Sequence, residues 1–132
     1  AKGTIIEGAK RIRAIALTDN IPQLTAWAND QSYEDIFVEQ LKNLLKEGDV
    51  VVGFSCSGNS MNVIKALEYA NRTGAISVGF TGFDGGKLKY TAKICLIVPC
   101  QNMQRCEDIH LLLTHMLSSL IRDETLKELN KH

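Results

Sequence analysis

Residues 48–67 read GDVVVGFSCSGNSMNVIKAL and set the pattern for the rest of the chain. The β-branched run Val50–Val52 is typical of a buried strand. A loop of small, hydroxyl-rich residues follows it. From Met61 onward the apolar residues recur at helical spacing. This part of the sequence therefore predicts a strand, a polar loop and a helix, in that order.

The polar loop, called the serine loop below, consists of Ser55, Cys56, Ser57, Gly58, Asn59 and Ser60. Backbone N–H groups and short hydroxyls between a strand and a helix N-terminus favour an anion, and a phosphate fits this arrangement well. Small residues are also what any tight strand-to-helix turn needs, so a purely structural role stays open. The loop carries neither the Gly-Lys-Ser/Thr ending of a Walker A sequence nor a dinucleotide-binding glycine pattern.

The composition restricts the class of protein. The chain has 132 residues, which is enough for one domain with its own core. Its 15 basic and 15 acidic side chains balance, so we predict no general nucleic-acid-binding surface. No apolar run approaches the length of a membrane span, and no signal peptide opens the chain. We therefore predict that neither nucleic acid nor membrane is a partner.

Four cysteines occur without a Cys-x-x-Cys pair, at Cys56, Cys95, Cys100 and Cys106. This spacing favours reduced thiols and a cytoplasmic protein. Cys56 lies inside the serine loop, where a helix N-terminus would activate a thiol. The alternative is a small filler residue whose backbone matters more than its sulfur.

The remaining sequence alternates between strand and helix patterns, which predicts an α/β fold with a parallel sheet covered on both faces. Ligands of such sheets bind at the carboxyl ends of the strands. Ala1-Lys2-Gly3 resembles the end of a helix. The predicted strands are 11–17, 50–54, 76–80 and 94–98, and the predicted helices are 22–27, the segment before Gly48, the segment from Met61 to Gly74, and 103–123.

The serine loop, with Gly48-Asp49-Val50 before it and Thr81–Leu88 after it, resembles the sugar-isomerase (SIS) domain, and within it the phosphoheptose isomerases. The similarity runs from about Ile12 to Leu120. It implies a three-layer α-β-α sandwich with a central parallel sheet, flavodoxin-like, and a long C-terminal helix. Residues 1–132 would form a single SIS domain. The family's N-terminal helix, first strand and Gly-rich loop are not found, and we expect them to be missing from this chain.

The resemblance implies a set of substrate-binding residues. The six residues of the serine loop would hold the phosphate of the substrate. Asn29 and Asp30 match an Asn-Asp pair that contacts the sugar phosphate in the family, at a preserved distance from the serine loop. A helix C-cap followed by a turn is the alternative explanation for that pair.

The family's last helix carries a metal-binding Gln and, eight residues later, a catalytic and metal-binding His, which match Glu107 and His115. Both would be catalytic and would bind a divalent metal, zinc. From the residues alone, Glu107 and His110, three apart on one helix face, could bind a metal, although a surface ion pair is the commoner role for such a pair. A lone histidine in an apolar stripe, such as His115, is usually a core residue. Eight residues span about 12 Å of ideal helix, so one ion could take both ligands only if the helix starts late or bends; otherwise the two residues serve different sites. Gln104, where the family has Asp, is a further departure.

The implied function is a phosphoheptose isomerase that converts sedoheptulose 7-phosphate to D-glycero-D-manno-heptose 7-phosphate through an enediol, as a step toward nucleotide-activated heptose. The implied partners are a heptose phosphate and further copies of the chain in a homotetramer. The alternative is a non-enzymatic SIS-domain regulator that binds a phosphosugar, or a protein-binding adaptor. A regulator of that kind needs the serine loop but no acid/base pair, so His115 and Glu107 favour the enzyme.

Overall fold

The structure is a computed structural model that describes residues 11–129. Contacts divide the chain into two units, Ala16–Ile109 and a unit made of Ala1–Ile15 with His110–His132. The helix end predicted at Ala1–Gly3 lies outside the described residues. The helices are α1 (Ile21–Asp30), α2 (Val38–Leu44), α3 (Met61–Arg72), α4 (Leu88–Thr91) and α5 (Met103–Leu129). The strands are β1 (Val50–Ser55), β2 (Ile76–Gly82) and β3 (Ile94–Val98).

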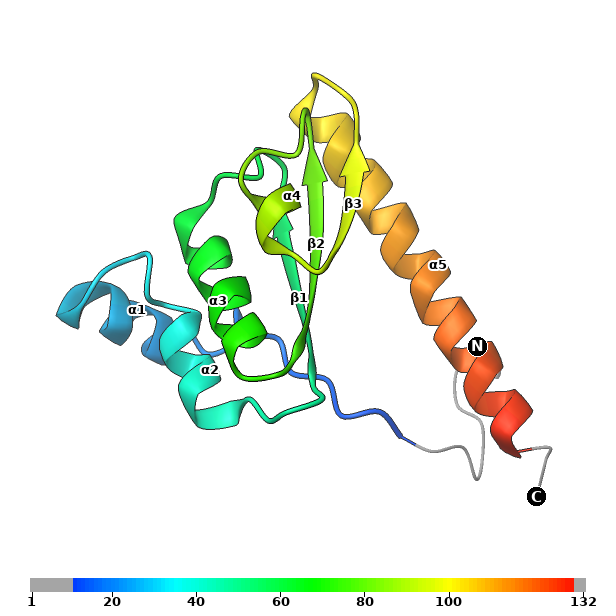
Figure 1. Ribbon diagram of the computed structural model, residues 1–132, viewed down its shortest axis with the longest axis horizontal. Coiled ribbons are helices and arrows are strands. Elements are labelled where there is room, and N and C mark those ends of the chain that lie inside the picture. The colour runs from blue at the N-terminus through cyan, green and yellow to red at the C-terminus, as the bar shows by residue number, and fades with distance from the viewer. Residues whose placement is uncertain (1–10, 130–132) are drawn as a thin grey trace. The chain divides into compact units, whose positions relative to one another are not determined.

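The strands of the larger unit form one parallel sheet in the order β1-β2-β3 (Figure 1). Each strand is followed by a helix, which is the connection that a parallel sheet requires. The three strands predicted at 50–54, 76–80 and 94–98 are confirmed within two residues at their ends. Because the strands are parallel, the loops after β1 and β2 lie at the same edge of the sheet.

Two glycines show which face of the sheet α3 and α4 cover. Gly53 in β1 and Gly79 in β2 are direct neighbours in the sheet register. A Cβ atom on Gly53 would lie 2.6 Å from Val63 of α3, and one on Gly79 would lie 3.1 Å from Leu88. Both helices therefore pack on the same face, so closely that a side chain at Gly53 would force Val63 to move.

The core of this unit forms between α3 and that face of the sheet. Val63, Ile64 and Leu67 of α3 cluster with Leu88 at the start of α4. Leu67 and Leu88 are fully buried. The apolar face predicted for the helix after the serine loop is thus confirmed, and its burial fixes the N-terminus of α3 against the end of β1.

The opposite face of the sheet carries larger side chains. The rings of Phe54 and Phe80 stack there with their centroids 4.7 Å apart. Cys106, in the first turns of α5, packs against Gly82, where an added Cβ would lie 2.5 Å from its sulfur. Helices of this unit thus reach both faces, which confirms the α/β class with three layers. Several apolar residues of this face remain exposed, among them Val50, Val52, Phe54, Ile76, Ile94 and Leu96.

The strand predicted at residues 11–17 is wrong. Residues 11–16 have neither strand nor helix geometry. A strand exists only by hydrogen bonding to a neighbour, and β1 has β2 as its one ladder partner among the described residues. The carbonyl oxygen of Leu17 instead accepts a hydrogen bond of 3.1 Å from the side chain of Gln40. The apolar residues Ile12 and Ile15 remain exposed.

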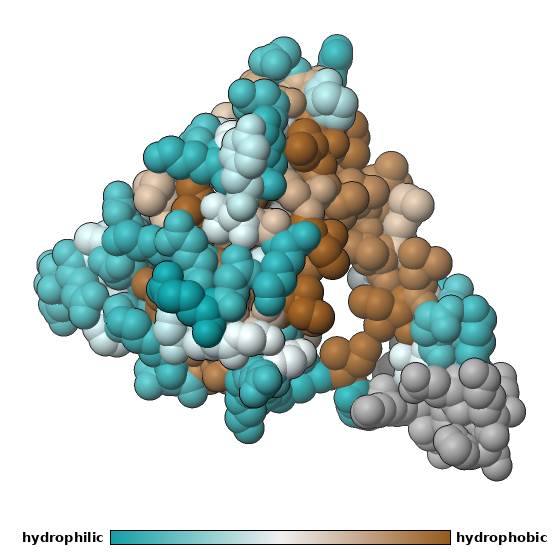
Figure 2. Space-filling model, viewed as in Figure 1, coloured by the Kyte–Doolittle hydropathy of each residue, from teal (hydrophilic) through white to brown (hydrophobic). Residues whose placement is uncertain are grey.

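The first and last helices are longer than predicted. α1 begins where Asn20 caps it, with the Asn20 side chain accepting from the N–H of Gln23 at 3.1 Å, and it continues to Asp30 rather than Trp27. α5 begins at Met103, as predicted, and reaches Leu129. Apolar side chains gather along α5 (Figure 2). No helix within residues 11–129 combines the length and hydropathy that crossing a membrane requires.

Candidate functional site

The serine loop is closed by hydroxyl groups at its two ends. Ser55, the last residue of β1, donates its hydroxyl to the Ser60 hydroxyl at 2.9 Å. The N–H of Ser60 points back to the Ser55 oxygen at 3.3 Å. Ser55 is buried, whereas Ser60 is half-buried. The pair therefore holds the carboxyl end of β1 against the N-terminus of α3.

The middle of the serine loop is shaped by Ser57, Gly58 and Asn59. The N–H of Asn59 donates to the Ser57 hydroxyl oxygen at 3.2 Å, and the Asn59 amide donates to the Ser57 carbonyl at 2.9 Å. The N–H of Gly58 donates to the Ser55 carbonyl at 2.9 Å. These contacts form a compact turn, and Gly58 completes it with a positive φ of 67°.

The donors of this loop differ from those predicted. The sequence predicts backbone N–H groups aimed at a ligand, but the N–H groups of Gly58, Asn59 and Ser60 are bonded within the loop. The hydroxyl oxygen of Ser57 accepts from the Asn59 N–H, and that of Ser60 accepts from the Ser55 hydroxyl. The hydroxyl hydrogens of Ser57 and Ser60 are therefore able to donate to another group. The hydroxyls of Ser57 and Ser60 are therefore the leading donors for an anion.

Residues 82–87, called the glycine loop below, pack directly on the serine loop. The N–H of Lys87 donates to the Asn59 side-chain oxygen at 3.2 Å. The N–H of Leu88 donates to the Gly58 carbonyl at 2.9 Å. A Cβ on Gly86 would lie 2.5 Å from the Ser57 carbonyl oxygen. The prediction that the loop after β2 lies near the serine loop is confirmed.

Thr81 is part of this junction, and the sequence analysis did not single it out. Its side chain is fully buried, and its hydroxyl donates to the Cys56 carbonyl at 3.3 Å. The N–H of Gly82 donates to the same carbonyl at 2.8 Å. The sequence does offer a signal for Thr81, because it is a polar residue that comes directly after the apolar run of β2. In the sheet register Thr81 lies beside Ser55, the first residue of the serine loop.

The environment of the Cys56 thiol raises its pKa. Partial burial raises its pKa most, and the negative charge of Glu107 and the thiol of Cys106 raise it further. A higher pKa reduces the thiolate fraction at neutral pH, so this environment favours the filler role over a reactive thiol. Glu107, at the start of α5, is thus close enough to the serine loop to act on Cys56 through its charge.

Asn29 and Asp30 are not brought to the serine loop. They form the end of α1, where both are exposed and the Asn29 amide donates to the Asp30 carboxylate at 2.9 Å. Within residues 11–129, no hydrogen bond or ion pair joins either of them to residues 55–60. α1 itself has no buried residue. Their substrate-binding role stays a prediction.

Glu107 and His115 both lie on α5 and are both exposed. The helix begins at Met103, before either residue, so the late start that would bring them together does not occur. Eight residues span about 12 Å along an ideal helix, and zinc binding by Glu107 and His115 stays a prediction. Within the described part of the chain, no three His, Cys, Asp or Glu side chains gather as metal ligands. His110, rather than His115, is the buried histidine.

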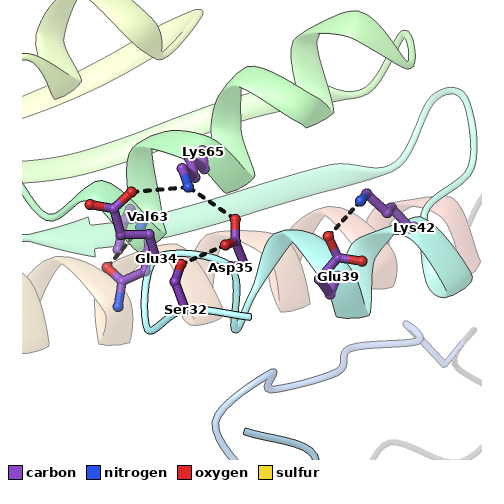
Figure 3. A network of polar contacts seen from close by, with 8 residues as sticks. Ser32, Glu34, Asp35, Glu39, Lys42, Val63 and Lys65 are labelled. Atoms are coloured by element: carbon purple, nitrogen blue, oxygen red, sulfur yellow. Dashed lines mark hydrogen bonds and ion pairs between the residues drawn. The ribbon is translucent and has the colours of Figure 1, made fainter. Parts of the chain in front are cut away.

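An ion network ties α3 to the segment before α2 (Figure 3). Lys65 of α3 bonds to Glu34 at 2.9 Å and to Asp35 at 3.0 Å. The Ser32 hydroxyl donates to Asp35 at 2.5 Å. The pKa of Asp35 is lowered mainly by that hydroxyl and then by Lys65. Lys65 is therefore engaged by two carboxylates of that segment.

Residues 4–82 match the SIS domain family. A probable phosphoheptose isomerase of Thermoplasma acidophilum is 41% identical over 122 residues, which are 92% of this chain and 67% of that protein. A phosphoheptose isomerase of Clostridium acetobutylicum is 40% identical over 119 residues, covering 90% of this chain and 61% of the relative.

Two solved structures resemble the fold. A phosphoheptose isomerase from Neisseria gonorrhoeae superposes with a TM-score of 0.82 at 38% identity, over 83% of this chain and 61% of that one. A phosphoheptose isomerase from Francisella tularensis gives a TM-score of 0.79 at 32% identity, over 82% of this chain and 58% of that one. The chain thus spans about three fifths of the length of most of these relatives. By sequence and by fold, this chain belongs to the SIS domain family and, within it, to the phosphoheptose isomerases.

Proposed function

We propose that the protein is an aldose-ketose isomerase that converts sedoheptulose 7-phosphate to D-glycero-D-manno-heptose 7-phosphate. The observation that carries this proposal is the serine loop, which is fixed at the carboxyl edge of a parallel sheet with the hydroxyls of Ser57 and Ser60 able to donate. The edge of such a sheet is where α/β proteins bind phosphorylated ligands. The relatives named above supply the reaction class.

The serine loop would bind the phosphate and so position the sugar for proton transfer. Isomerisation moves a proton between adjacent carbons through an enediol, and it needs a base, an acid near the oxygens and stabilisation of negative charge. In this proposal His115 is one acid/base group, and Asn29 with Asp30 orients the sugar. We assign no second base.

The zinc predicted at Glu107 and His115 stays a prediction, because the two residues belong to different units of the chain. Glu107 and His115 are separated by about two turns of α5. We therefore route no step of the reaction through a metal. Glu107 takes a further part in the proposal: after partial burial, its charge is the next cause that raises the pKa of Cys56 in the serine loop.

The proposal includes a cytoplasmic homotetramer. Exposed apolar side chains on α5 support association with further copies, because soluble monomers rarely expose contiguous apolar surface of this kind. These residues are Leu111, Leu112, Met116, Leu120 and Ile121. Sedimentation of the protein at micromolar concentration measures the assembly directly.

A phosphosugar-binding regulator is the second candidate. It is favoured by one observation: the contacts that bring the serine and glycine loops together include neither His115 nor Asn29 and Asp30. A regulator requires only that the phosphate site be formed.

An isomerisation assay with sedoheptulose 7-phosphate distinguishes the two candidates. We expect turnover by the wild-type protein, a loss of at least about a hundredfold in His115→Ala, and no loss in Ser119→Ala on the same helix. Phosphosugar binding without turnover would overturn the isomerase and leave the regulator.

A further inference from the structure

The serine loop contains no charged side chain, although its proposed ligand carries up to two negative charges. Its donors are the hydroxyls of serine residues and one asparagine amide. Neutral donors form weaker hydrogen bonds to an anion than charged donors do. The neighbouring cation Lys65 is occupied by Glu34 and Asp35. A cation on another element would therefore strengthen the binding of a phosphate.

Lys87 is fixed beside the serine loop by its backbone. Its own N–H donates to the Asn59 side-chain oxygen at 3.2 Å. The N–H of the next residue, the fully buried Leu88, donates to the Gly58 carbonyl at 2.9 Å. The preceding residue, Gly86, lies against the Ser57 carbonyl. Lys87 is thus held on both sides against residues 57–59.

The ammonium group of Lys87 is available. The side chain is exposed, and no hydrogen bond or ion pair within residues 11–129 engages its Nζ. Lys89, two residues on, differs. Its Nζ donates to the Asp84 carbonyl at 2.9 Å and lies 4.8 Å from the centre of the Tyr90 ring. The glycine loop therefore carries one engaged lysine and one whose charge is free to meet a ligand.

We propose that Lys87 is the cationic contact of the phosphate bound at the serine loop and that it gives the site its preference for phosphorylated over unphosphorylated sugars. The flexible four-carbon stem lets the ammonium approach the anion as a point charge. This inference rests on the proposed phosphate site but not on turnover. In this inference the serine hydroxyls position the phosphate by hydrogen bonds, and Lys87 supplies the positive charge that attracts it.

Calorimetric titration with sedoheptulose 7-phosphate tests the assignment, with unphosphorylated sedoheptulose as the second ligand. We expect Lys87→Gln to weaken binding of the phosphate ester by about five- to twentyfold. Lys89→Gln, the matched control in the same loop, should change it by less than about twofold. Lys87→Arg should restore most of the affinity. The difference between Lys87→Gln and wild type should shrink as salt is added, because screening removes the charge term.

Equal affinity in wild type and Lys87→Gln would overturn the inference while leaving the phosphate site in place. Equal losses in Lys87→Gln and Lys89→Gln would also overturn it, because they would indicate a diffuse effect of net charge. Failure of the wild-type protein to bind the phosphate ester would remove the proposed function and this inference with it. Thermal unfolding of each variant identifies any loss of affinity that comes from loss of structure.

Discussion

The Cβ position of Gly58 lies 2.1 Å from the carbonyl oxygen of Gly85, so the serine loop and the glycine loop meet backbone against backbone. A side chain on Gly58 would occupy space already filled by the other loop. Gly58 also has a positive φ, which L-residues with side chains rarely adopt. The proposed phosphate site therefore depends on two loops that follow different strands and that approach this closely because position 58 is glycine.

Gly58→Ala should destabilise the protein and weaken its binding of phosphosugars. The left-handed backbone and the forced contact together cost about 2–5 kcal/mol of unfolding free energy. Chemical denaturation measures the loss. Gly48→Ala is the control, since Gly48 has a positive φ but nothing within 4 Å of its Cβ position. It should lose only the backbone cost, about 1–2 kcal/mol. Equal losses in the two variants would contradict the close contact of the loops.

Gly82 and Cys106 should show a compensating pair of substitutions. Gly82→Ala places a methyl group 2.5 Å from the Cys106 sulfur and should cost about 1–3 kcal/mol. Cys106→Ala removes that sulfur and alone costs about 1 kcal/mol, as for a deleted buried methyl. The double variant should be more stable than the sum predicts by about 1 kcal/mol or more. A double-mutant cycle measured by denaturation gives this coupling, and strict additivity would argue against the packing of α5 on β2.

The protonation of Cys56 should respond to Glu107. Partial burial first, and then the charge of Glu107, raise the pKa of the Cys56 thiol. Glu107→Gln removes a negative charge, so the pKa falls, the thiolate fraction at pH 8 rises and alkylation accelerates. Peptide mapping after timed treatment with iodoacetamide resolves Cys56 from the other three cysteines. Asp108→Asn removes the adjacent charge and should leave the rate unchanged. A faster reaction in that control alone would contradict the orientation of α5.

The Ser32–Asp35 hydrogen bond should give a stability difference that depends on pH. The pKa of Asp35 is lowered, first by the Ser32 hydroxyl and then by Lys65. A lowered pKa in the folded state means that the contribution is present above the unfolded-state pKa, about 3.9, and disappears as pH falls through the folded-state value. Ser32→Ala should therefore be less stable than wild type at pH 6, and the two should converge in acid. A difference that persists unchanged at pH 2 would point to a cause other than Asp35 ionisation.

Local pattern predicted the parts of the fold that local interactions determine. β1, the serine loop and α3 were read from residues 48–67, because a β-branched run, a polar loop and an amphipathic helix each have their own signature. Strand pairing is not local, and for this reason the prediction of a strand at residues 11–17 is wrong. The segment has the sequence pattern of a strand, but no neighbouring strand hydrogen bonds to it within the described residues.

The position of the two loops of the candidate site was predictable from the sequence, but the side-chain contacts around them were not. Parallel topology was sufficient to place residues 81–87 beside the serine loop. The contact of Cys106 with Gly82 was not predictable, because a buried cysteine in α5 has no distinctive spacing. The same holds for the difference between Lys87 and Lys89, which depends on where the Asp84 carbonyl points.

Titration of the protein with sedoheptulose 7-phosphate, beside Ser57→Ala, tests most directly whether the serine loop binds a sugar phosphate. A hydroxyl that donates to a charged group contributes about 1.5–3 kcal/mol. We therefore predict saturable binding by wild type, weaker by about tenfold or more in Ser57→Ala, and no change in Ser118→Ala, whose hydroxyl donates only to the α5 backbone at 2.8 Å. Equal affinity in wild type and Ser57→Ala would contradict the account.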